Sequence, residues 1–321
     1  MWIDKLKYDP FQIFSEANNP VINYFVKTDL LGQHVSAPDV LWHLPEVKRI
    51  IKQQRGDGAW QYKGNRPGDA HGENYELLET WRKMSLLINC YAMDKSHPAL
   101  RAGAEFIFSC QTEEGDIRGI LSNQYIPYYM GVILETLIKA GYEQDKRTLR
   151  AFDWLSSMRQ EDGGWIIPMN MFKMHKYKEL CQGEPIPPDK TLRFSHLATG
   201  MVLRGYAVHP ELRKSQPATI AARLIKSRLF ERDTFSSRQA KKYWFKFRYP
   251  FWWTELVSVL DSLKYFGFSI SDQKITEGIQ WLIDQQEENG GWKSAYEQKN
   301  QPVNLWVSLA ICRVLKYYLD A

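Results

Sequence analysis

Apolar side chains recur every three or four positions through most of the chain. Before Gln286 they fall at Ile275, Ile279, Leu282 and Ile283, which is the spacing of a helix with one buried face. The same pattern predicts further one-sided helices at about 43–54, 97–110, 145–159 and 214–229. These helices are expected to face water with their charged side.

A second set of segments is apolar nearly all round. The clearest members span about 124–141 and 251–267, and the last segment, about 302–319, is similar. Helices of this kind are buried on every side. The two sets alternate along the chain, which predicts an inner layer of helices wrapped by an outer layer. The last helix could close a ring against an N-terminal helix at about 19–33.

A short phrase of Gln, polar residues, Gly and Trp separates the predicted helices. It stands at Gln54–Trp60, Gln160–Trp165 and Gln286–Trp292, and a copy at Gln111–Ile117 has Ile in place of Trp. A degenerate copy of the phrase is expected near 229–235. A phrase that returns at long intervals indicates one repeated supersecondary element, here helix, Gly-Trp loop and helix.

The repeats predict an all-α protein with five to six helix pairs in one α/α toroid. The whole chain, 1–321, would form this single domain, with an N-terminal extension at 1–18 and a long loop at 166–191. The loop is too long for a tight turn and could lie over the mouth of a cavity.

The Gln-x-x-x-Gly-x-Trp phrases between alternating helices resemble the repeats of the squalene-hopene and oxidosqualene cyclases. The α/α toroid of these cyclases is shared with the β-subunits of protein prenyltransferases. The resemblance covers about 20–320 as repeat architecture. It implies a central cavity at the N-terminal ends of the inner helices.

The motifs that carry chemistry in these relatives are missing from this chain. It has no Asp-x-Asp-Asp and no Asp-Cys-Thr-Ala-Glu, the acid motifs of the two cyclase groups, and no zinc-binding Asp-x-Cys. No motif therefore requires a cofactor. A zinc site remains an alternative, built from His71, His196 and either Glu76 or Glu255.

The composition indicates which kinds of binding partner and which cellular location to expect. The net charge is +5 and no block of like charges forms a tail, so no nucleic-acid partner is expected. The spacing of the four Cys is not typical of a metal site, and we interpret them as reduced thiols that contribute to packing. No signal peptide or transmembrane run is present, which predicts a cytoplasmic protein that could also contact a membrane surface.

Three residues at the expected starts of inner helices are candidate acids or bases. His196 begins an apolar segment, and Arg193 stands three residues earlier, on the same face if both are helical. Glu255 follows two Trp, and Glu76 could face inward one turn before Thr80. Each has a structural alternative: a hydrogen-bonded His, or a carboxylate paired with a cation or with a helix N-terminus. Glu79 and Lys83 are expected to pair on the helix surface.

Polar and aromatic residues at the same helix starts are candidate ligand-binding groups. Besides Arg193 they are Tyr75, Tyr128, Tyr129, Trp252, Trp253, Asn304 and Trp306. The aromatic and basic stretch 241–253 has three interpretations: a cavity lining that stabilises a cation, an interfacial membrane contact, or packing around a helix start.

Three functions are consistent with these patterns. The leading hypothesis is a terpenoid-cyclase-like or prenyltransferase-like protein that binds or transforms an apolar, isoprenoid-type ligand, with Glu255 or Glu76 as the acid and His196 as the base. The second is a non-catalytic binding or scaffold protein on the same fold. The third is a metal-dependent enzyme.

Overall fold

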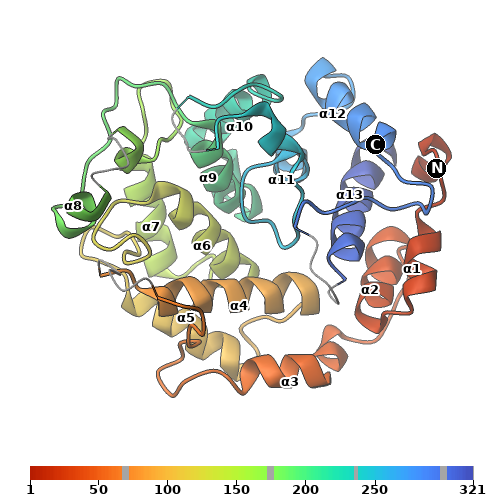
Figure 1. Cartoon of the computed structure of the whole chain (residues 1–321), viewed down its shortest axis with the longest axis horizontal. Coiled ribbons are helices and arrows are strands. Elements are labelled where there is room, and N and C mark those ends of the chain that lie inside the picture. Colours follow the sequence, from red (N-terminus) through yellow and green to blue (C-terminus); the bar gives the residue numbers. More distant parts are fainter. Residues whose placement is uncertain (67–71, 172–176, 235–237, 297–301, 321) are drawn as a thin grey trace. The chain divides into compact units, whose positions relative to one another are not determined.

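The computed structural model of the chain describes residues 1–66, 72–171, 177–234, 238–296 and 302–320 (Figure 1). The chain divides into two compact units. Unit 1 comprises 1–37, 222–232 and 240–321, and unit 2 comprises 38–221 and 233–239. The single domain over 1–321 stays a prediction.

The described residues are helical and form no β-strand, so the predicted all-α class is confirmed. The helices of unit 2 are η3 (Pro38–His43), α3 (Pro45–Ile51), α4 (Tyr75–Tyr91), α5 (Pro98–Ser109), α6 (Pro127–Lys139), α7 (Lys146–Ser157), η4 (Pro168–Met171), α8 (Tyr177–Gln182), α9 (His196–Val208) and η6 (Leu212–Lys214). Helix α10 (Gln216–Ser227) runs from unit 2 into unit 1. The helices of unit 1 are η1 (Trp2–Lys5), α1 (Phe11–Ala17), α2 (Pro20–Phe25), η2 (Val26–Leu30), η7 (Lys241–Phe245), α11 (Leu256–Leu263), η8 (Lys264–Phe266), α12 (Gln273–Asp284) and α13 (Val303–Asp320).

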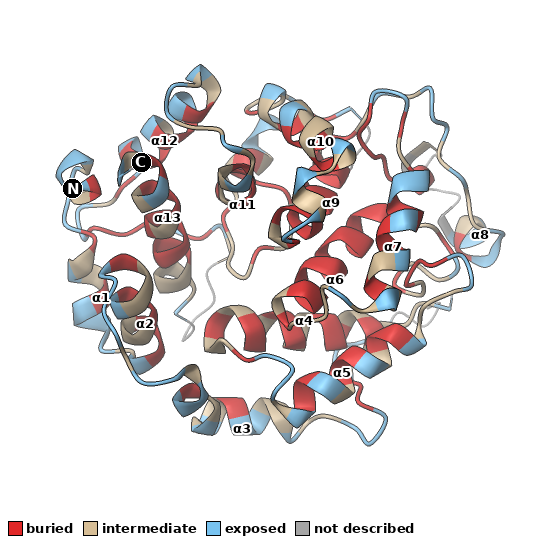
Figure 2. Ribbon diagram, turned by 180° about the vertical axis from the view of Figure 1, so that it is seen from behind, coloured by how far each residue is buried: buried red, intermediate tan, exposed pale blue. Residues whose placement is uncertain are grey.

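The two kinds of helix differ in burial as predicted. Nearly every residue of α6 and α9 is buried, whereas α7 and α5 alternate between buried and exposed faces (Figure 2). Helices α6 and α9 approach closely at Gly131, where an added Cβ would lie 2.3 Å from the Cα of Val202. Only a residue without a side chain permits this approach.

A buried ion cluster also joins α6 to α9. Glu135 pairs with Arg204 at 2.5 Å and with Lys139 at 2.7 Å. Burial by itself would raise the pKa of Glu135, but Arg204 and Lys139 outweigh it and hold that pKa below its ordinary value of 4.5. The charged carboxylate is therefore the form that the fold stabilises.

The side chains of Gln54, Gln111 and Gln286 each fix their own loop and a second segment. The amide of Gln54 donates to the carbonyl oxygen of Gly58 at 2.9 Å and to that of Ala99, at the start of α5, at 2.8 Å. Gln111 does the same, whereas Gln160 donates to two carbonyls of the segment before α9. These bonds join Gln111 to Gly115 and Arg147, and Gln160 to Asp189 and Leu192.

The Trp of each phrase is held from both ends. The indole N–H of Trp165 donates to the carbonyl oxygen of Leu155, ten residues earlier, and its backbone N–H donates to the hydroxyl of Thr199 on α9. Trp60 and Trp292 make the corresponding pairs of bonds. The phrase thus ties one helix C-terminus to the next buried helix, which explains why it recurs.

The degenerate copy of the phrase near 229–235 differs in structure from the phrases that contain Gln and Trp. Trp244 takes the place of the missing Trp: it is buried and its indole N–H donates to the carbonyl oxygen of Glu231 at 2.8 Å. Phe230 adopts a φ of +68°, a conformation that favours Gly. Residues 235–237 lie outside the described part of the chain.

Two element boundaries in the structure differ from the predicted ones. The helix expected at 251–267 begins at Leu256, because Glu255 caps it with its side chain. The expected N-terminal extension, 1–18, contains η1 and α1, and the backbone N–H of Trp2 donates to Asp320 at 2.7 Å. Gln286 bonds to this segment through Lys7 and Tyr8. The first residues are therefore part of the packed structure of unit 1.

Candidate functional site

His196 opens helix α9 in unit 2, beside a carboxylate that sequence reasoning missed. The imidazole Nδ1 lies 3.7 Å from Oδ1 of Asp233, and both side chains are almost fully buried. The backbone N–H of His196 donates to the same carboxylate at 2.8 Å. The structure thus gives this His a charged neighbour within a buried site.

Asp233 accepts hydrogen bonds from both sides of the α9 terminus. Its Oδ2 accepts from the Ser195 hydroxyl at 2.7 Å, and its Oδ1 also accepts from the backbone N–H of Thr234 at 2.8 Å. Ser195 in turn caps α9 through the backbone N–H of Ala198. A helix N-terminus favours a negative charge, so this is a stable place for a buried carboxylate.

Arg193 does not share a helix face with His196. The helix begins at His196 itself, with Ser195 as its N-cap, so Arg193 lies in the preceding turn and its side chain is exposed. The prediction that the two residues lie on one helical face is wrong. The ligand-binding role of Arg193 stays a prediction.

Tyr128 and Tyr129 lie next to each other at the start of α6, and both are buried. Their ring centroids are 4.7 Å apart, and the Tyr129 ring meets that of Trp81 edge-to-face at 5.7 Å. Just before them, Tyr125 donates to Glu114 at 2.7 Å. Burial and then Glu114 raise the pKa of Tyr125 to about 12, so it remains a neutral phenol.

Tyr75 and Glu76 lie in the first turn of α4. Arg66 pairs with the Glu76 carboxylate and lies 5.8 Å from the centre of the Tyr75 ring. The Tyr75 ring also packs against Tyr62 at 4.9 Å. Further along α4, Glu79 and Lys83 pair at 3.2 Å, which confirms the predicted ion pair, but Glu79 is buried and does not lie on the helix surface as predicted.

In unit 1, the carboxylate of Glu255 is engaged by the helix that it caps. Its Oε2 accepts from the backbone N–H of Val257 and its Oε1 from that of Ser258, both at 2.8 Å. The Ser258 hydroxyl accepts from the backbone N–H of Glu255 at 3.1 Å and completes a capping box. The capping alternative for this residue accounts for both carboxylate oxygens.

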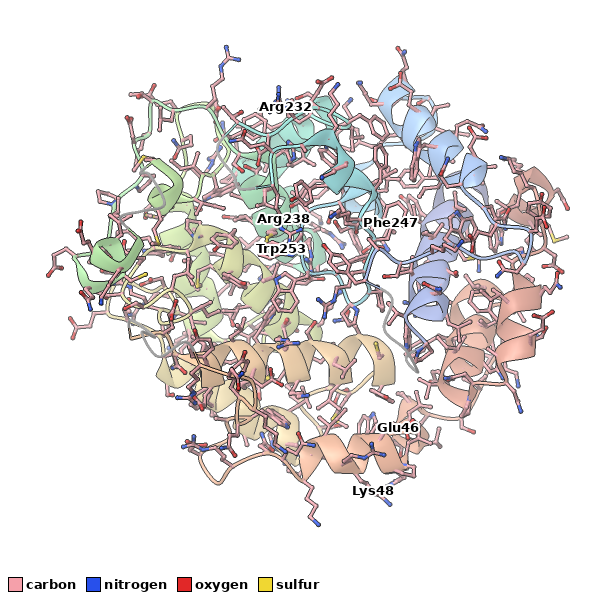
Figure 3. The ribbon with its side chains drawn as sticks, viewed as in Figure 1. Glu46, Lys48, Arg232, Arg238, Phe247 and Trp253 are labelled. Atoms are coloured by element: carbon pink, nitrogen blue, oxygen red, sulfur yellow. The ribbon has the colours of Figure 1, made fainter. Side chains whose placement is uncertain are left out.

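Trp252 and Trp253 lie in the irregular segment before α11. Figure 3 labels Trp253 and the buried Phe247, which precedes it in the same segment. The two indoles are 6.0 Å apart, and the guanidinium of Arg248 lies 4.9 Å from the centre of the Trp252 ring. Trp252 therefore presents a π face that already interacts with a cation.

Trp306 and Asn304 lie in the first turn of α13. The Trp306 ring stacks on Tyr249 at 5.9 Å and meets Phe25 edge-to-face at 5.8 Å. The side-chain oxygen of Asn304 accepts from the backbone N–H of Ser294 at 2.8 Å. A gap beside Glu255, lined by Tyr249, Phe251 and neighbouring residues, has no space for a water molecule.

Metal-binding groups were also sought. Within the described residues no group of three or more His, Cys, Asp and Glu side chains is arranged to hold a metal ion. His71, a member of the predicted zinc alternative, lies outside the described residues. The described helices include none that is both long enough and apolar enough to cross a membrane.

The helices and phrases of unit 2 can now be compared with known families. Residues 78–191 match the squalene-hopene cyclase C-terminal domain. The match lies within unit 2 and includes the phrases that begin at Gln111 and Gln160. The predicted resemblance to the squalene-hopene cyclases is thus confirmed for this part of the chain.

Similar structures were also found. A protein from Actinoplanes is 16% identical, with 88% of this chain and 87% of that chain covered and a TM-score of 0.44. The type II terpene cyclase MstE from Scytonema is 12% identical in its apo form, with 84% and 95% covered and a TM-score of 0.33. A variant of MstE in complex with geranylgeranyl dihydroxybenzoate is also 12% identical, with 94% and 99% covered and a TM-score of 0.36. No curated protein matches the chain.

Proposed function

We propose that this protein is terpenoid-cyclase-like and binds or transforms an apolar, isoprenoid-type ligand. The observation that carries the proposal is the match of residues 78–191 to the squalene-hopene cyclase C-terminal domain. The hydrogen bonds of the Gln-Gly-Trp phrases support it, since the same bonds recur outside the matched residues, at Gln54 and Gln286.

In this proposal His196 is the base. A cyclisation that passes through a carbocation ends when a base removes a proton, and the imidazole would then carry a positive charge. Asp233, 3.7 Å from that ring, would stabilise the charged form. Asp233 is thus proposed as the residue that orients and supports His196.

Aromatic side chains would stabilise the cation itself. In unit 2, Tyr128 and Tyr129 are proposed to do so, because the negative faces of their rings attract positive charge. In unit 1, Trp252, Trp253 and Trp306 are candidates on the same ground, and the contact of Arg248 with the Trp252 ring is an example of such an interaction. Tyr75 and Arg193 in unit 2 and Asn304 in unit 1 stay proposed binding groups.

The acid of this proposal is Glu255 or Glu76. An acid that protonates an alkene must donate its proton from a carboxyl oxygen. Both oxygens of Glu255 accept backbone N–H groups, so this role would cost at least one bond of the helix cap. Glu76 would have to separate from Arg66.

The helix cap made by Glu255 and the ion pair between Glu76 and Arg66 favour a second candidate function. A protein that keeps Glu255 as a helix cap and Glu76 in an ion pair could hold the apolar ligand without transforming it. This non-catalytic binder shares the fold and the aromatic residues with the first candidate. The two differ in whether His196 and one of these carboxyl groups take part in a reaction.

The experiment that separates them is incubation of the purified protein with acyclic polyprenyl alcohols and diphosphates, followed by mass spectrometry of the extracted products. A cyclic isomer that is lost in His196→Ala and kept in His34→Ala, where the His is exposed, supports the enzyme. Saturable binding without a product supports the binder. Neither binding nor product would remove both candidates.

A further inference from the structure

An open groove lies along the exposed face of α12 in unit 1 (Figure 1). Its volume is about 570 Å³, within the range of small-molecule sites. It is lined by six polar side chains and one aromatic ring, which belong to Ser271, Gln273, Thr276, Glu277, Gln280, Asp284 and Trp281. The six polar residues are exposed and Trp281 is half-buried. Since small-molecule sites are mostly apolar, this lining indicates a ligand rich in hydrogen-bonding groups.

The polar side chains of the groove form a pattern that repeats along the helix. The amide of Gln273 donates to Oε1 of Glu277 at 3.0 Å, and that of Gln280 donates to Oδ1 of Asp284 at 3.1 Å. In each pair the two residues are one helical turn apart, and the second pair follows the first after about 10 Å along the helix axis. Each carboxamide and each carboxylate has further hydrogen-bonding capacity. The groove therefore offers a ligand two similar sets of donors and acceptors.

The indole ring of Trp281 is held in place by three phenylalanines of unit 1. Phe245 stacks on it with ring centroids 4.2 Å apart, and Phe247 meets it edge-to-face at 5.7 Å. Phe230 in turn stacks on Phe245 at 5.9 Å. Because Phe245 covers one face of the indole, a ligand in the groove can contact only the other face and the edge. Trp281 thus offers a pre-positioned apolar surface, whose ordering on binding costs little entropy.

The charges at the groove balance. Nζ of Lys274 lies 3.5 Å from Oε2 of Glu277, and Nζ of Lys7 lies 3.6 Å from Oδ1 of Asp284. Two carboxylates and two ammonium groups leave no net charge to attract an ion. A cationic ligand would compete with the two lysines, and an anionic ligand would meet the two carboxylates. The balance of charge therefore favours an uncharged ligand.

We infer that the groove binds a neutral carbohydrate, with a sugar ring packed against Trp281 and its hydroxyl groups bonded to the two Gln–carboxylate pairs. A hydroxyl both donates and accepts, so it can bond to a carboxylate oxygen and to a carboxamide N–H at once. The C–H groups of a sugar ring form an apolar surface that can pack on an indole. The inference is independent of the proposed function, because no residue of the groove is among the proposed isoprenoid-binding groups.

The test is isothermal titration calorimetry of the full chain with four neutral hexasaccharides: maltohexaose, cellohexaose, mannohexaose and xylohexaose. The wild type is expected to bind at least one of them saturably. Trp281→Ala should weaken that binding at least about tenfold, because it removes the aromatic surface. Gln280→Ala should weaken it about three- to tenfold, because it removes hydrogen-bonding groups and leaves Trp281 in place. Since Gln280 is exposed, its variant decides the test if Trp281→Ala does not fold.

Trp42→Ala and Gln33→Ala are the matched controls. Trp42 is half-buried in unit 2, Gln33 is exposed in unit 1, and neither lines the groove. Both variants should bind as the wild type does, and thermal unfolding shows which variants are folded. Wild-type affinity in folded Trp281→Ala or in Gln280→Ala, or no binding of any hexasaccharide by the wild type, would overturn the inference. Tighter binding of spermidine that Glu277→Gln abolishes would also overturn it, since the groove would then be a site for cations.

Discussion

The carboxylate of Asp233 accepts a 2.7 Å hydrogen bond from the hydroxyl of Ser195, across 38 positions of sequence. This bond anchors the degenerate fourth repeat to the start of α9 and places a negative charge beside His196. Trp60, Trp165 and Trp292 each fix the buried helix that follows them, whereas Asp233 holds the start of α9, which precedes it in the chain. The candidate base of the proposed function lies at that helix start.

Asp233→Ala should therefore lower the free energy of unfolding by about 2–4 kcal/mol. The change removes acceptors for Ser195 and for the backbone N–H groups of His196 and Leu197, all of them buried. Urea unfolding of the variant and the wild type measures the loss. Asp284 is on the exposed side of α12. An equal loss of stability in Asp284→Ala would contradict the claim that the hydrogen bonds of Asp233 at the start of α9 stabilise the protein.

Gly131→Ala should be among the most destabilising single-methyl changes in the chain. The new Cβ would lie 2.3 Å from the Cα of Val202, so α6 and α9 would have to separate, at a cost of about 3 kcal/mol or more. Gly56→Ala is the control, because no atom lies within 4 Å of its added Cβ. Similar melting temperatures for the two variants would contradict the close approach.

Gln286→Ala should cost about 2–4 kcal/mol of stability. Its amide joins the last phrase to the first residues, with donors to Tyr8 and Gly290 and an acceptor for Lys7 and Tyr8. Gln280→Ala removes a Gln from the exposed face of α12, the helix that ends just before Gln286, and should change stability by about 0.5 kcal/mol or less. Urea unfolding compares the two variants. A loss of stability in Gln280→Ala as large as in Gln286→Ala would contradict the role of Gln286 in joining the last phrase to the first residues.

The buried Glu135 predicts a pH dependence. Its pKa in the folded protein lies below the ordinary 4.5, so its contribution to stability is present above about that pH and is lost as the pH falls through the folded pKa. The stability difference between wild type and Glu135→Gln should thus be largest at neutral pH and shrink toward about pH 3. A difference for Glu135→Gln that is constant with pH would refute the assignment.

Much of the fold could be predicted from the sequence because its causes are local. The apolar period at Ile275–Ile283 determines one helix without reference to distant residues, and Gly290, with its positive φ, determines the turn that follows the end of that helix. The pairing of Glu79 with Lys83 is local in the same way, since the two are one helical turn apart.

The site could not be predicted as well, because its contacts join distant residues. Nothing near Asp233 indicates that its carboxylate caps α9. The start of α11 was missed for a different reason: Glu255 and Ser258 form a capping box with the acid first, the reverse of the usual Ser/Thr-x-x-Glu order. Arg193 was placed on a helix that begins three residues later.

The central claim is that the protein holds an apolar, isoprenoid-type ligand, and native mass spectrometry of protein purified from its own host tests it most directly. The account predicts a complex whose extra mass is extracted by organic solvent and identified as an isoprenoid. Protein that carries no such mass, and that acquires none after incubation with polyprenyl alcohols or diphosphates, would contradict it.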